Sequence, residues 1–182
     1  MRDRAGRYRC GMTTWLKALC VLGMLCIWIP AHARMELLKS GEMPVLAADE
    51  GLLVVGVDSN MQLRRVSLRK DGARLGGVSL RNLPEGRSFS IYALPAGRYG
   101  WSQLEPFSGL KYRMETEKEF EFDVFAGKIN YAGDLQFRAK TVDSSSFHIA
   151  NRSLGIIDWL KKEHSQLYTK YELNYTGHYP DP

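Results

Sequence analysis

Cysteine is scarce in this sequence, and it occurs only near the N-terminus. The 182 residues include three cysteines, Cys10, Cys20 and Cys26, all of them before residue 34. A disulfide framework or a cysteine-ligated zinc site needs several cysteines in the folded domain. The sequence therefore excludes both from the region after residue 33 and predicts that packing alone stabilises it.

The sequence also lacks an apolar run long enough to cross a membrane. Its N-terminal apolar run, ALCVLGMLCIWI at 18–29, has 12 residues, whereas a membrane-spanning helix needs about 20. A basic segment precedes the run and contains Arg2, Arg4, Arg7, Arg9 and Lys17. Pro30 ends the run, and the A-x-A triplet Ala31-His32-Ala33 follows. This is the order of a secretory signal peptide.

We therefore predict a signal peptide at 1–33 that is cleaved between Ala33 and Arg34. The remaining chain is expected in the periplasm or outside the cell, with no stable membrane span. A start at Met12 instead of Met1 leaves this prediction unchanged. The alternative is an uncleaved segment that anchors the domain in the inner membrane.

Charge of one sign is not in large excess once the signal segment is set aside. The chain has 25 Lys and Arg against 20 Asp and Glu, and the first 33 residues hold five of the former and one of the latter. The basic pI of 9.1 thus comes largely from that segment. The sequence gives no electrostatic reason to expect a nucleic-acid partner. The length after residue 33 fits one domain.

Motifs of enzymes and cofactor sites are missing as well. There is no HExxH, no G-x-S-x-G and no P-loop. Three histidines follow residue 33, namely His148, His164 and His178, and none has metal-site spacing. We predict no cofactor and no metal. Ser144–Ser146 lie near His148 and are interpreted as a loop, although a triad assembled only in space stays an alternative.

Short segments typical of β-strands recur along the chain after residue 50; the first is a continuous apolar run and the clearest of the others alternate in polarity. They are 51–58, 62–69, 73–81, 88–94, 98–104, 120–124, 129–132, 135–139 and 146–150. Turn residues separate them and predict hairpins of 62–69 with 73–81 and of 88–94 with 98–104. Gly133-Asp134 predicts a bulge. The pattern predicts an antiparallel β-sandwich of about seven or eight strands.

Helical spacing occurs only near the C-terminus. Apolar residues recur at helical intervals from Leu154 to Leu167, which predicts one α-helix packed on the sandwich. The predicted organisation is a signal peptide at 1–33, a lead-in at 34–50, the sandwich with its helix at 51–173, and a tail at 174–182.

Two segments carry a resemblance to a known family. IYALPAGRYGW at 91–101 and FDVFAGKINYAGDL at 122–135 resemble hallmark turns of transthyretin-like, or prealbumin-like, β-sandwich modules of exported bacterial proteins of unknown function. The resemblance spans roughly 51–167 and implies the sandwich fold, without an active site. Gly97 and Gly127 allow positive φ in these turns. Tyr99 and Tyr131 are expected to pack with their hydroxyls available to a partner.

An acidic stripe is one of two candidate binding surfaces. It consists of Glu115, Glu117, Glu119, Glu121 and Asp123, which fall on every second residue. On a strand these side chains share one face. We interpret the stripe as a solvated face opposite a strand that carries Arg65 and Arg69. The alternative is a docking stripe for a basic partner or a weak calcium site.

A strip of tyrosines in the C-terminal region is the other candidate. Tyr168, Tyr171, Tyr175 and Tyr179 have rings suited to interfaces. We interpret them as a cover for the domain's own core, with docking on an envelope partner or a glycan as the alternative. The function that fits best is a non-catalytic binding or structural module of the bacterial cell envelope, with a possible envelope protein partner. A periplasmic hydrolase is the alternative.

Overall fold

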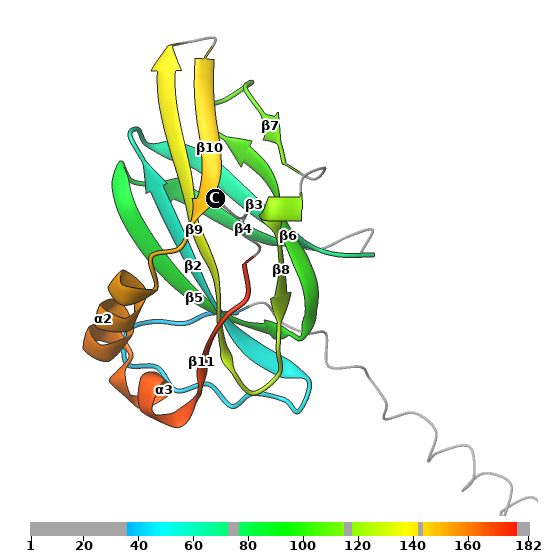
Figure 1. Cartoon of the computed structure of the whole chain (residues 1–182), viewed down its shortest axis with the longest axis vertical. Helices are drawn as coiled ribbons and strands as arrows, with labels where there is room; N and C mark the ends of the chain where they lie inside the picture. The colour runs from blue at the N-terminus through cyan, green and yellow to red at the C-terminus, as the bar shows by residue number, and fades with distance from the viewer. Residues whose placement is uncertain (1–35, 73–76, 115–117, 142–143, 178–182) are drawn as a thin grey trace, which may run out of the picture. The chain divides into compact units, whose positions relative to one another are not determined.

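Two β-sheets face each other in the described part of the chain, and two short helices cover the outer side of one sheet (Figure 1). The computed structural model describes residues 36–72, 77–114, 118–141 and 144–177, all within one compact unit at 34–182. The predicted mainly β, sandwich-like architecture is confirmed. The predicted seven or eight strands are too few, because the described residues form eleven. Three of these have only two or three residues, too few to produce a period in the sequence.

The first sheet is mixed rather than antiparallel. Its strands follow the order β1 (Glu36–Leu37), β5 (Gly86–Pro95), β2 (Glu50–Ser59), β9 (Ile129–Thr141) and β10 (Ser144–Ala150), and β11 (Leu173–Tyr175) also pairs with β9. β2 and β11 both run parallel to β9, so the purely antiparallel prediction is wrong here. Parallel neighbours need a long connection. The chain between β2 and β9 supplies it by forming β5 of the same sheet and the strands of the second sheet.

The second sheet lies across the core from the first. Its order is β4 (Val78–Leu83), β3 (Leu63–Lys70), β6 (Gly97–Glu105) and β7 (Tyr112–Arg113), with β8 (Glu121–Val124) also paired to β6 and the 3₁₀ turn η1 (Lys118–Phe120) before it. The first predicted hairpin is confirmed, because β3 pairs with β4. The second is wrong: β5 and β6 belong to different sheets, and Gly97, with φ of 142°, lies where the chain passes between them.

Strand β2 separates two apolar cores. Leu53, Val55 and Val57 point between the sheets, where Trp101 and Phe122 are also fully buried. Leu52 and Val54 point the other way, into a second core beneath the helices. This explains the continuous apolar run of β2, because a strand covered on both faces has no solvent side.

The predicted C-terminal helix is divided into two. Helix α2 spans Ser153–Glu163, and α3 spans Ser165–Lys170. Their buried residues Ile156, Leu160 and Leu167 close the second core. The lead-in is attached to the end of α2, since the Gly41 amide donates to the Glu163 carbonyl at 3.0 Å. No helix among the described residues is both long and apolar enough to span a membrane.

His164, between the two helices, makes the stability depend on pH. Its ring is 3% exposed and lies 4.9 Å from the Trp159 ring. Burial lowers the pKa of His164 below its usual 6.5, and the Glu163 charge only partly opposes this. The unfolded chain therefore binds a proton at His164 more readily than the folded chain does. The contribution of His164 to the free energy of unfolding is fully present above pH 6.5 and falls as the pH drops below that value.

We expect the free energy of unfolding, measured by urea titration, to be lower at pH 5 than at pH 7. In His164→Gln this pH-dependent difference should be smaller, because the replaced side chain does not titrate. Equal pH dependence in the two proteins would contradict this prediction.

Candidate functional site

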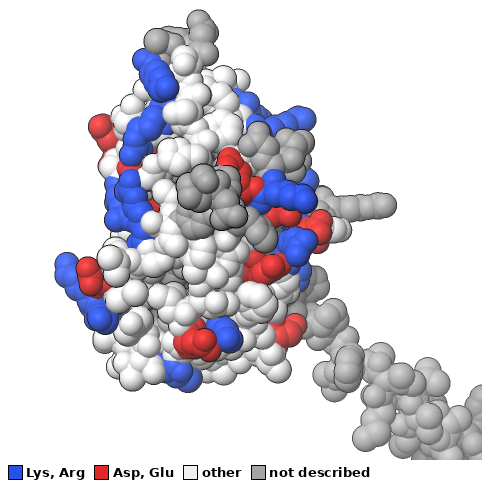
Figure 2. Space-filling view, in the orientation of Figure 1, with Lys and Arg blue, Asp and Glu red and all other residues white. Residues whose placement is uncertain are grey.

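A polar area on the outer face of the first sheet is the candidate site. The helices cover the part of this face that carries Leu52, Val54 and Ile129. Beyond them the face turns polar, with Arg87, Asp58, Gln136 and His148 side by side on β5, β2, β9 and β10. We call the area formed by Asp58, Arg87, Asp134, Gln136, Arg138, His148 and Arg152 the open polar face. In Figure 2, Lys and Arg line the left edge of the molecule above α2.

The predicted bulge at Gly133 positions Asp134 on the open polar face. The β2–β9 register shifts so that Val54 lies opposite Tyr131 but Gly56 lies opposite Asp134. One extra residue of β9 fits into the shift, and Gly133 adopts φ of 93° there. Tyr131 and Asp134 therefore share the outer face although three positions separate them. The bulge prediction is confirmed.

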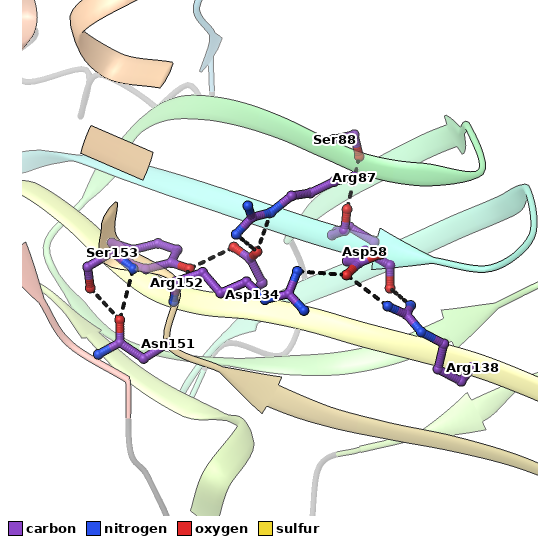
Figure 3. A network of polar contacts seen from close by, with 10 residues as sticks. Asp58, Arg87, Ser88, Asp134, Arg138, Asn151, Arg152 and Ser153 are labelled. Atoms are coloured by element: carbon purple, nitrogen blue, oxygen red, sulfur yellow. Dashed lines mark hydrogen bonds and ion pairs between the residues drawn. The ribbon is translucent and has the colours of Figure 1, made fainter. Parts of the chain in front are cut away.

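Asp134 is buried in an ion pair with Arg87 (Figure 3). The Arg87 Nε and Nη2 both donate to Asp134 Oδ2, at 2.8 and 2.6 Å, and the Tyr131 hydroxyl donates to Oδ1 at 2.7 Å. The Asp134 side chain is 0% exposed and that of Arg87 is 30% exposed. A Cβ at Gly56 would overlap the Asp134 carboxylate. Burial and the hydrogen bond with Asp134 raise the pKa of Tyr131, so this hydroxyl remains a donor.

Asp58 holds two arginines at once. Arg138 Nη2 and Arg152 Nη1 donate to the same Oδ2 of Asp58, at 2.8 and 2.9 Å. Arg138 Nη1 also donates to the Asp58 carbonyl at 2.8 Å. The hydrogen bond from Arg138, aided by both positive charges, keeps the pKa of Asp58 below its usual 3.8 despite partial burial. The Asp58 side chain is 13% exposed, whereas Arg138 and Arg152 are 36% and 39% exposed.

Gln136 connects this cluster to His148. In the orientation that satisfies both ends of its amide, Gln136 donates to His148 Nε2 at 2.8 Å and accepts from Arg152 Nε at 3.1 Å. Arg152 Nη2 is a further donor to the same oxygen. His148 Nε2 is therefore the acceptor of this hydrogen bond.

The arrangement suits binding better than catalysis. Asp134 is buried and Asp58 is partly buried, and both are paired with arginines whose side chains are more exposed than the acids. Ser146 lies opposite Arg138 on β10, but His148 takes its hydrogen bond from Gln136. Within the described ranges, no serine, histidine and carboxylate converge as a hydrolytic triad requires. Nor is any group of His, Cys, Asp and Glu in those ranges placed to hold a metal ion.

The predicted acidic stripe is only partly on a strand. Glu119 lies in η1, Glu121 and Asp123 lie in β8, and Glu115 and Glu117 are outside the described residues. β8 pairs with β6, so Asp123 contacts Arg98 at 3.3 Å. For Glu121 and Asp123 the strand directly opposite is thus β6, and not β3, which carries Arg65 and Arg69.

Arg65 instead binds a buried acid that the sequence analysis missed. Glu105 is 1% exposed and accepts hydrogen bonds from Arg65 and Arg64. The Arg65 hydrogen bond is the main cause that lowers the pKa of Glu105.

The tyrosine strip packs on the second core as far as it is described. Tyr168, Tyr171 and Tyr175 are partly buried against that core, and the Tyr175 ring meets the Tyr131 ring edge-on at 5.8 Å. This is the packing expected if the strip covers the domain's own core. Tyr179 lies outside the described residues, as do Ala33 and Arg34 of the predicted cleavage site.

The open polar face was not recognised in the sequence, although one signal for it was present. Asp134, Gln136 and Arg138 follow the Gly133 bulge at every second position, the spacing of one strand face. Asp58 lies next to the last residue of the apolar strand β2 and has the same parity as Leu52 and Val54.

Comparisons of the chain with family models, with curated proteins and with solved structures found no match in any of the three. The transthyretin-like resemblance thus stays a prediction from the sequence.

Proposed function

We propose that this protein is an exported, non-catalytic binding module of the bacterial cell envelope, built as a transthyretin-like sandwich, with the open polar face as its binding surface. The observation that carries the proposal is the pair of partly exposed arginines, Arg138 and Arg152, whose guanidinium groups are held on one oxygen of Asp58. Side chains fixed in this way lose little further freedom when they bind a partner. A rigid cationic surface on a sheet therefore favours an anionic partner.

The sequence supports the export that this proposal requires. The basic segment, the short apolar run and the A-x-A triplet at 31–33 are the parts of a secretory signal. Export to the periplasm or the cell exterior is consistent with a domain whose stability needs no cysteine. The paired acids and the Gln136–His148 hydrogen bond favour this proposal over a hydrolase.

Cross-linked capture of the tagged protein from its native envelope tests the proposal. We expect to recover the protein from a fraction outside the cytoplasm, with the intact mass of a chain that begins at Arg34. We also expect it to capture a component reproducibly that an unrelated exported control protein does not capture. Recovery from the cytoplasm with residues 1–33 intact would contradict export. Capture of nothing beyond the control would contradict the binding role.

A further inference from the structure

We propose that the open polar face holds a site for a phosphate monoester group, formed by Arg138, Arg152 and His148. This inference rests on the proposed binding function and specifies its ligand. The three side chains come from β9, from the connection before α2, and from β10, and their order across the sheet follows from the strand register. They form one connected cluster, because Asp58 joins Arg138 to Arg152 and the Gln136 amide joins Arg152 to His148.

Unused hydrogen-bond donors are the first argument for this site. A guanidinium group has five N–H donors. Arg138 donates to the Asp58 carboxylate and to the carbonyls of Asp58 and Phe137, all through Nη1 and Nη2. Its Nε has no partner among the described residues. Arg152 uses one donor on Asp58 and two on Gln136, so both arginines keep donors for a ligand.

The second argument is the distribution of charge with depth. Asp58 is 13% exposed beneath arginines that are 36% and 39% exposed. An anion that approaches from solvent thus meets the guanidinium groups before it meets the carboxylate. Exposed Lys140 lies two positions beyond Arg138 on β9 and adds positive charge to the same face. Asp58 fixes the arginines without presenting its own charge at the surface.

The third argument concerns the shape of the anion. Guanidinium groups bind phosphate and carboxylate through paired hydrogen bonds. A carboxylate is planar and has two oxygens, which one guanidinium satisfies. A phosphate monoester has three terminal oxygens and close to two negative charges at neutral pH. It therefore suits the two guanidinium groups of Arg138 and Arg152 together, with the exposed ring of His148 beside them on β10.

Titration calorimetry with O-phosphoserine tests the inference on the protein purified in its exported form. We expect saturable binding with a dissociation constant of about 1 mM or tighter at low salt. Arg138→Gln and Arg152→Gln should each weaken it about tenfold or more, since each removes charge-assisted hydrogen bonds. Arg152→Lys keeps the charge but loses the fork, so it should also weaken binding if paired hydrogen bonds matter.

Arg98→Gln is the matched control, because Arg98 is also an exposed arginine in an ion pair, with Asp123 on the other sheet. It should leave phosphoserine binding unchanged. Thermal unfolding of each variant shows whether it is folded. If a glutamine variant does not fold, the binding measured for Arg152→Lys decides the outcome.

Four results would overturn the inference: no saturable phosphoserine binding, equal weakening by Arg98→Gln, equally tight binding of acetate, or binding only to vesicles of phosphatidylglycerol, a phosphodiester lipid. Any of these leaves the proposed binding function standing if the envelope capture still recovers a component. Failure of the capture is therefore distinguishable from failure of the phosphate site.

Discussion

Replacement of Asp134 by asparagine is expected to lower the free energy of unfolding by about 3 kcal/mol, although the side chain keeps nearly the same size. Asp134 is fully buried, and its Oδ2 accepts two hydrogen bonds from Arg87. Asparagine removes the negative charge and leaves a partly buried guanidinium without its counterion. The lack of space beside Gly56 prevents the new amide from turning away freely. Urea unfolding at pH 7 measures the loss.

Asp123→Asn is the matched control for this substitution. Asp123 pairs with Arg98 at 3.3 Å, but these side chains are 33% and 54% exposed. Water solvates both charges there, so the expected loss is under about 1 kcal/mol. Equal losses in the two variants would show that the Asp134–Arg87 pair contributes no more than a surface ion pair.

Asn130→Ala is expected to destabilise the protein by a similar amount, about 3 kcal/mol. Asn130 is 0% exposed and closes the connection between β8 and β9. Its Oδ1 accepts from the Phe125 amide at 3.0 Å, and its Nδ2 donates to the carbonyls of Leu52, Phe125 and Lys128 at 3.0 to 3.1 Å. Alanine leaves these backbone groups without that partner in a region largely closed to water.

Asn60→Ala provides the comparison. Asn60 also makes two side-chain hydrogen bonds to backbone, both with Ala139, at 2.9 and 2.8 Å, but it is exposed. Water replaces the lost partner there, so we expect a loss of about 1 kcal/mol or less. If denaturant titration finds Asn60→Ala as damaging as Asn130→Ala, burial of Asn130 is not the cause of its effect.

Local patterns predicted strands well and strand partners poorly. Alternation along 62–69 and 73–81 was sufficient for the β3–β4 hairpin, because both strands and their turn are adjacent in sequence. The LPAGRY segment also contains turn residues, yet it carries the chain from one sheet to the other. The Tyr99 hydroxyl donates to the Pro95 carbonyl at 2.8 Å across this turn, which gives Tyr99 the hydroxyl partner that was predicted. A turn motif therefore fixes the local bend but not the sheet that the next strand joins.

Local sequence patterns could not predict the open polar face either, because its residues are far apart in the sequence. Asp58 meets Arg138 across 80 positions, and Arg87 meets Asp134 across 47. The parallel pairing of β2 with β9 brings Asp58 to Arg138, and the pairing of β5 on the other side of β2 brings Arg87 to Asp134. Parallel partners are distant in sequence. The acidic stripe was conspicuous in the sequence because its members are close together. Of its members within the described residues, Glu121 and Asp123 lie on a strand and Glu119 lies in η1.

The most direct test of the open polar face as a binding surface is the cross-linked envelope capture repeated with two charge-matched variants. Arg138→Gln/Arg152→Gln removes the arginines held by Asp58. Arg64→Gln/Arg98→Gln removes two exposed arginines that pair with Glu105 and Asp123 on the second sheet. We predict that the first variant, still folded by thermal unfolding, loses the component that the wild-type protein captures, and that the second retains it. Equal capture by both variants, or equal loss in both, would contradict a binding role for this face.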